Sequence, residues 1–146
     1  MPLETLDRPV RPSPTPAAPA AEPCREVLTG LVSSAPSVLG AVVATVDGRA
    51  FAHASHVDHE FDPARVAAIS SSLLALSESF SREALQCQAQ HTSIATSRGT
   101  LVVVRVPSRT RAHALCLWAD SSENFAMTLR FALDTATRIA EMLDAA

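Results

Sequence analysis

VLGAVVATVDGRAFAHA, residues 38–54, contains two β-rich runs on either side of Asp47-Gly48. The first run, residues 38–46, is rich in β-branched side chains, which favour a pleated and half-buried backbone. An Asp-Gly pair between two such runs is the strongest short-range signal of a β-hairpin. The stretch therefore predicts two antiparallel strands, the second over residues 49–54, joined by a tight turn.

A long helix is predicted to follow the hairpin. Asp62 supplies a side-chain acceptor for the free N–H groups of a first turn, and Pro63 fits the first helical position. The helix is expected to run to about Leu85. Its large apolar residues recur at steps of three and four and form one stripe along it. The residues of this stripe are Val66, Ile69, Leu73, Leu76 and Phe80.

A second side of this helix also lacks the charge of a solvated surface. Leu74 and Leu85 lie near the side opposite the stripe, together with the small residues Ala67 and Ser71. A surface helix normally carries charged residues on that side. We therefore expect the helix to be covered on two sides, by its own sheet and by a second body.

The remaining segments complete an α+β fold. A helix is expected from Pro23 until Pro36 ends it. Three further strands are expected at residues 87–97, 100–106 and 112–119. Asp120 and Glu123 have the spacing of a capping box before a final amphipathic helix. The predicted order is helix, two strands, helix, three strands, helix. Tight turns make neighbouring strands antiparallel, which predicts one five-stranded meander sheet with helices on its faces.

The composition indicates one globular domain with a proline-rich tail. The chain has 146 residues, of which 47% are hydrophobic and 18% charged, a balance typical of globular domains. Seven of the ten prolines fall within the first 23 residues, and proline disfavours both helix and sheet. We expect residues 1–22 to form a disordered Pro-rich tail and residues 23–146 to form the folded domain.

Charge and residue usage exclude several classes of function. The net charge of −3 lacks the electrostatic footprint of a nucleic-acid binder, so no nucleic-acid partner is expected. The chain contains no lysine, which excludes chemistry that needs a lysine amine, including a P-loop. Three cysteines without paired spacing favour reduced thiols in the cytoplasm. No apolar run approaches the ~18 residues of a membrane-spanning helix, so no membrane partner is expected.

In their order and spacing, these elements resemble the Roadblock family. This is the dynein light-chain type of domain, which in bacteria includes MglB-type regulators of Ras-like GTPases. The resemblance extends over about residues 24–146. It rests on residues 38–43 (VLGAVV), Asp47-Gly48, Ala52, Asp62 with the alanines that follow it, Gly99 and residues 101–104.

The resemblance implies the arrangement of the fold and a homodimer. The middle helix would lie on one face of the five-stranded antiparallel sheet, and the two terminal helices on the other. The middle helix and the third strand would meet their symmetry mates, which would leave no unpaired edge at the third strand. The residues implied near the dimer or partner interface are Ala67, Ser71, Leu74 and Glu78. The family implies no role for the Pro-rich tail or for the His-rich loop after the second strand.

The residues that could act as metal ligands, nucleophiles or bases do not form a catalytic or cofactor-binding motif. His53, His56 and His59 alternate with carboxylates and are conceivable metal ligands, but nothing predicts the helix that would align them, so we expect a solvated loop. Cys87 and His91 would share a strand face at roughly 13 Å, too far for a thiolate–imidazole pair. The serines of the middle helix lack a nucleophile elbow. We therefore expect no enzyme activity, no metal and no cofactor.

Two arginines, Arg109 and Arg111, lie in the turn after the fourth strand. They are either contact residues for an acidic partner or part of a solvated turn. The same two interpretations apply to three residues of the middle helix, Arg65, Arg82 and Glu78. Any exposed arginine is also a possible arginine finger for a GTPase, and the sequence singles out none.

These observations predict a non-enzymatic homodimeric interaction module that regulates or scaffolds a small Ras-like GTPase in the cytoplasm. One alternative is a structural adaptor subunit of a larger assembly with no GTPase contact. A second alternative is a small-ligand or metal-sensing domain.

Overall fold

The computed structural model describes residues 20–145, and the order of its elements is the predicted one. The elements are α1 (Ala21–Ser34), β1 (Val38–Thr45), β2 (Ala50–Ser55), α2 (Pro63–Leu85), β3 (His91–Thr96), β4 (Gly99–Val106), β5 (His113–Asp120) and α3 (Phe125–Ala145). Helix α1 begins two residues before Pro23, which occupies its first turn. Residues 1–19 of the predicted tail lie outside the described residues.

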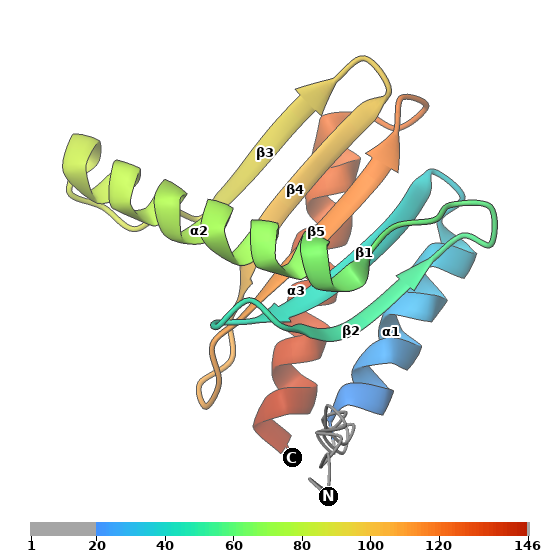
Figure 1. The fold of residues 1–146 in the computed structure, drawn as a ribbon, viewed down its shortest axis with the longest axis horizontal. Helices are drawn as coiled ribbons and strands as arrows, with labels where there is room; N and C mark the ends of the chain where they lie inside the picture. Colours follow the sequence, from blue (N-terminus) through green and yellow to red (C-terminus); the bar gives the residue numbers. More distant parts are fainter. Residues whose placement is uncertain (1–19, 146) are drawn as a thin grey trace, which may run out of the picture.

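The elements form three layers around one five-stranded antiparallel sheet. Helix α2 crosses one face of the sheet, and α1 and α3 lie side by side on the other (Figure 1). The α+β class, the element order and the placing of the three helices are therefore confirmed. None of the described helices combines the length and apolar character that a membrane crossing requires.

The strand order differs in one place from a continuous meander. The sheet runs β2-β1-β5-β4-β3, so the hairpin and the three-stranded meander are joined by the pairing of β1 with β5. Helix α2 consequently connects the two opposite edges of the sheet, and β3 becomes an edge strand that pairs with β4 alone within residues 20–145. The long crossover explains why adjacency along the chain did not predict this order.

Alternating side chains of the central strands build two cores. On the α1 and α3 face, Val43, Val104, Leu115 and Leu117 pack among the apolar residues of both terminal helices. On the α2 face, the sheet presents a second set of side chains, against which Ala67 and Ser70 of α2 are buried. These sheet residues are Val42, Ala44, Val103, Ala114, Cys116 and Trp118. The residues divide between two cores because successive side chains of a strand point to opposite faces of the sheet, and helices cover both faces.

The predicted start of α2 is confirmed, whereas that of α3 needs a correction. The Asp62 carboxylate accepts hydrogen bonds from the N–H groups of Ala64 and Arg65 at 3.1 and 3.3 Å, and Pro63 occupies the first turn. At α3, the side-chain oxygen of Asn124 accepts the N–H of Met127 at 2.8 Å.

Asp120 and Glu123, expected as a capping box, make other contacts instead. The Asp120 carboxylate accepts the Ser122 N–H, and that of Glu123 accepts the Ser37 hydroxyl at 3.0 Å. The capping-box spacing is therefore a wrong indication of the helix start, because Asn124 is as good an N-cap residue and lies directly before the apolar run.

Candidate interaction site on helix α2

The apolar stripe of α2 is largely uncovered. Ile69, Leu76 and Phe80 expose 59%, 68% and 74% of their surface, whereas Val66 and Leu73 are half-buried against the sheet. We call Ile69, Leu73, Leu76 and Phe80 the apolar flank. A contiguous run of exposed large apolar side chains on one side of a helix is typical of a contact surface. This flank is therefore the candidate functional site.

Strand β3 extends the apolar flank onto the edge of the sheet. Ile94 of β3 is 44% exposed and lies with Ile69, Leu73 and Thr92 around a hollow of about 140 Å³. The hollow is almost wholly apolar because Val103 and Cys116 form its floor. The apolar flank and the β3 edge thus form one continuous surface.

The predicted interface residues lie on the other side of α2. Ala67 is fully buried against the sheet, and Leu74 packs on the same core. The Ser71 hydroxyl donates to the Thr45 carbonyl oxygen at 2.9 Å, and Glu78 forms ion pairs with neighbouring arginines. These four residues therefore contact their own chain, whereas Ile69, Leu76 and Phe80 of the apolar stripe remain exposed.

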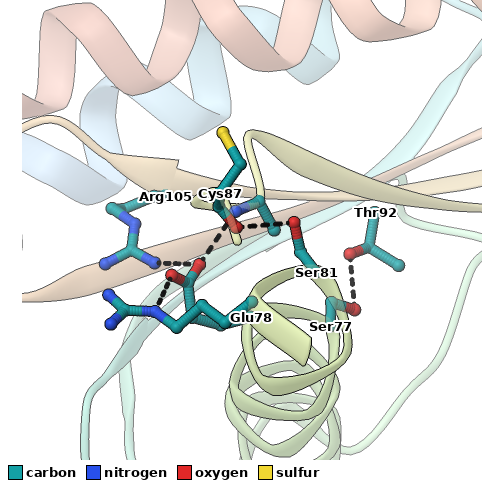
Figure 2. Close-up of polar contacts among 8 residues, drawn as sticks. Ser77, Glu78, Ser81, Cys87, Thr92 and Arg105 are labelled. Carbon is teal, nitrogen blue, oxygen red and sulfur yellow. Dashed lines mark hydrogen bonds and ion pairs between the residues drawn. The ribbon is translucent and has the colours of Figure 1, made fainter. Parts of the chain in front are cut away.

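Glu78 is the centre of a polar network that positions the C-terminal half of α2 (Figure 2). One oxygen of its carboxylate accepts from Arg82 Nε at 2.8 Å, and the other accepts from Arg105 and from the Ala89 N–H, each at 3.1 Å. The hydrogen bond from Arg82 is the main reason that the pKa of Glu78 is lowered, and Ala89 and Arg105 add to it. The network ties α2 to the loop before β3 and to β4.

Two hydroxyl groups complete this attachment. Ser77 accepts the Thr92 hydroxyl of β3 at 2.7 Å, and Ser81 donates to the Cys87 carbonyl oxygen at 2.8 Å (Figure 2). These two serines of the middle helix thus hold it to the sheet and to the loop. Sequence reasoning missed Arg105 and Thr92, because a pairing across 27 or 15 positions leaves no periodic signal.

The loop after β2 is partly held against the sheet. His59 Nε2 accepts the Trp118 indole N–H at 2.9 Å, and the Phe61 ring packs edge-on to Trp118 with the ring centroids 4.9 Å apart. His56 Nε2 lies 3.2 Å from the Pro36 carbonyl oxygen. His53, expected in the loop, instead lies in β2, where it pairs with Val42 and its side chain is exposed. The expectation of a wholly solvated loop is therefore wrong for His59.

The predicted metal and thiol candidates are placed apart from one another. Within residues 20–145, no three His, Cys, Asp or Glu side chains gather closely enough to hold a metal ion. Cys87 lies in the loop before β3, whose first residue is His91, so the shared strand face expected for these two residues does not form. Cys116 is buried in the sheet, where desolvation raises the pKa of its thiol.

His113 is a buried histidine whose Nδ1 has no hydrogen-bond partner among the described residues. It packs edge-on to the Phe51 ring with the centroids 4.8 Å apart. Burial disfavours the charged imidazolium and lowers the pKa of His113 below its usual value near 6.5. The unfolded chain, in which His113 is solvated, therefore binds a proton more readily than the folded protein.

This difference predicts a loss of stability in mild acid. The contribution of neutral His113 is complete above the unfolded pKa and declines as the pH falls below about 6.5, by at most about 1.4 kcal/mol per pH unit. We expect urea unfolding between about pH 7 and pH 5 to show this slope, and His113→Leu to remove it. His53→Gln is the matched control because His53 is exposed. An equal slope in His113→Leu would assign the acid sensitivity to other groups.

Comparison with known proteins agrees with this architecture. The family model of the Roadblock/LC7 domain matches residues 25–111, more than half of the chain. A comparison with curated protein sequences finds no significant match. The match extends from α1 through β4, so it includes α2, the apolar flank and the edge strand β3.

Solved structures show the same fold at low sequence identity. An MglB with a tetrameric arrangement is 17% identical, with a TM-score of 0.74 and coverage of 93% of this chain and 98% of that chain. The gliding protein MglB from Thermus thermophilus is 16% identical, with a TM-score of 0.74 and coverage of 94% and 100%. A Roadblock/LC7 domain from Streptomyces avermitilis is 20% identical, with a TM-score of 0.69 and coverage of 82% and 96%. The fold and the family match lead to one conclusion: the chain belongs to the Roadblock/LC7 family.

Proposed function

We propose that this protein is a homodimeric interaction module that regulates or scaffolds a small Ras-like GTPase. Membership of the Roadblock/LC7 family supports a module of the GTPase-regulator or adaptor kind. The observation that carries the proposal is the uncovered apolar flank of α2 beside the open edge of β3. In a monomer both features would promote aggregation, whereas in an interface the partner covers both.

A second copy of this chain fits the apolar flank and the β3 edge together. The outer edge of β3 leaves backbone N–H and C=O groups without a strand partner among the described residues. A twofold axis next to β3 would pair this edge with its own mate and bring the two apolar flanks into the same contact, which is an isologous interface. The tetrameric arrangement of the similar MglB supports self-association as a property of this fold.

The family resemblance supports a small GTPase as the partner, and the proposed mode of action needs no catalytic groups on this chain. A dimer presents a rigid platform, because the Glu78 network holds α2 to the sheet in each copy. Such a platform would act by binding one nucleotide state of the partner more tightly than the other and shifting the population towards it. A change in GTP hydrolysis would then be a property of the complex.

The experiment combines capture with a rate measurement. Immobilised full-length protein is exposed to a lysate of its source organism containing either GDP or a non-hydrolysable GTP analogue. We expect a small Ras-like GTPase to be retained in one of the two conditions. The purified GTPase is then expected to change its rate of GTP hydrolysis or nucleotide release when this protein is added.

Each result of this experiment separates the alternatives. A GTPase that is retained without any change in rate supports the scaffold and removes the regulator. Recovery of this protein or a paralogue alone, in both nucleotide conditions, contradicts the GTPase partner and favours a structural adaptor in a larger assembly.

A further inference from the structure

A groove of about 590 Å³ lies on the flank of α2 opposite the apolar flank. Ser71, Leu74, Ala75 and Glu78 of α2 form one wall. The other wall consists of the ends of β1, β4 and β5 and the β4–β5 loop, residues 107–112. Its volume lies within the range of about 300–1,000 Å³ that is usual for ligand sites.

The β4–β5 loop is held in one conformation by α3. The Asp144 carboxylate accepts from the Ser108 hydroxyl at 2.6 Å, from the Arg109 N–H at 3.0 Å and from the Thr110 hydroxyl at 3.1 Å. The Ser108 oxygen in turn accepts the Arg111 N–H at 3.2 Å. These hydrogen bonds lower the pKa of Asp144, with that from Ser108 first. The loop that carries Arg109 and Arg111 is therefore preorganised.

The arginines of the groove fall into two kinds. Arg105 is paired with Glu78, so its charge is already compensated. Arg109 and Arg111 are exposed, line the groove and form no ion pair within residues 20–145. The groove thus presents two free guanidinium groups from an immobilised loop. Such groups bind carboxylates with paired, charge-assisted hydrogen bonds.

Apolar surface lies next to these charges. Val46, in the β1–β2 turn, is 78% exposed, and with Leu74 and Ala75 it forms the apolar part of the groove. Together these three side chains offer an apolar patch that suits contact with an apolar side chain of a partner. The groove therefore combines one apolar patch with a flanking positive pair.

We propose that this groove binds an acidic segment of a partner protein, with Arg109 and Arg111 contacting its carboxylates and Val46, Leu74 and Ala75 receiving one apolar side chain. An acidic segment suits the groove better than a lone phosphate group, because a peptide can place carboxylates on the two arginines and an apolar side chain on the apolar patch at the same time. The groove and the apolar flank lie on opposite sides of α2, so self-association leaves the groove open. The inference therefore holds for the monomer and for the dimer, with or without a GTPase as the partner.

A defined peptide tests the groove without knowledge of the partner. The probe is an acetylated heptapeptide with one leucine flanked on each side by three aspartates, and its control has asparagines in place of the aspartates. In ¹⁵N–¹H NMR titrations of the full-length protein, we expect the acidic peptide to shift amides of residues 45–46, 71–78 and 105–114. Binding is expected to weaken when NaCl is raised from about 0.05 M to about 0.5 M, because salt screens exposed charges.

Matched variants identify the residues responsible. Arg109→Gln with Arg111→Gln is expected to raise the Kd of the acidic peptide about tenfold or more. Arg65→Gln with Arg138→Gln makes the same change in net charge at exposed arginines outside the groove and is expected to leave the Kd within about twofold. Val46→Ser is expected to abolish the preference for a peptide with leucine over one with alanine.

Three results would overturn the proposal. One is an equal loss of affinity in the two arginine pairs, which would mean attraction by net charge. Another is a set of shifted amides that lies outside the groove, or equal shifts with the asparagine control. The third is that inorganic phosphate at the same concentration shifts the groove amides as strongly as the peptide, which would assign the groove to a small anion. Because the peptide needs no dimer and no GTPase, these results are independent of the proposed function.

Discussion

Leu76→Glu combined with Phe80→Glu is expected to convert the proposed dimer of this protein into a monomer. Both side chains are more than two-thirds exposed in the single chain, so the substitutions remove little of its own core. In a twofold interface each change appears twice, so the contact would have to bury four carboxylates, which is costly. We expect the Kd of self-association to rise by about 100-fold or more, equivalent to at least about 2.7 kcal/mol.

Sedimentation equilibrium of the wild type and the double variant measures this change. Met127→Glu combined with Leu133→Glu is the matched control, because these two α3 residues are also exposed apolar side chains. The control is expected to remain dimeric, and circular dichroism checks that both variants keep the fold. A wild-type protein that is monomeric at about 100 µM, or a Leu76 and Phe80 variant that still dimerises, would show that the apolar flank is not the interface.

Gly99→Ala is expected to lower the free energy of unfolding by about 3 kcal/mol or more. Gly99 begins β4 with φ +154°, and a Cβ at this position would lie 2.0 Å from the Ala119 carbonyl oxygen. The clash is with backbone of the neighbouring strand, so relief requires β4 and β5 to separate. Alanine therefore adds both backbone strain and a displaced strand pair.

Chemical denaturation with urea compares this variant with Gly30→Ala in the middle of α1. A Cβ on Gly30 meets nothing within 4 Å, so alanine there is expected to stabilise the protein by about 0.5–1 kcal/mol through higher helix propensity. The two substitutions add the same methyl group and are expected to act in opposite directions. A loss below about 1 kcal/mol at Gly99 would mean that the β3–β4 turn relaxes more easily than its contacts indicate.

Local signals in the sequence predicted most of the elements. The Asp47-Gly48 turn, the Asp62 cap of α2 and the stepping of apolar residues each depend on neighbours within a few positions, and all three are present in the structure. The capping box at Asp120 was wrong because Asn124, a second good N-cap residue directly before the apolar run, caps α3 in its place. The pairing of β1 with β5 was not predicted because it joins segments some 75 positions apart.

Some features of the candidate site were likewise determined by the sequence, and others were decided only by the tertiary structure. The sequence by itself determined that α2 has one large apolar stripe and one side of small residues, because a period of 3.6 residues fixes angles around the helix axis. Only the tertiary structure decided which side meets the sheet, because periodicity does not set the rotation of a helix about that axis. Ala67 packs closely and the hydroxyls of Ser71 and Ser77 find partners on the sheet, so the small side faces inward. The large apolar residues are consequently left at the surface, where a second protein chain can cover them.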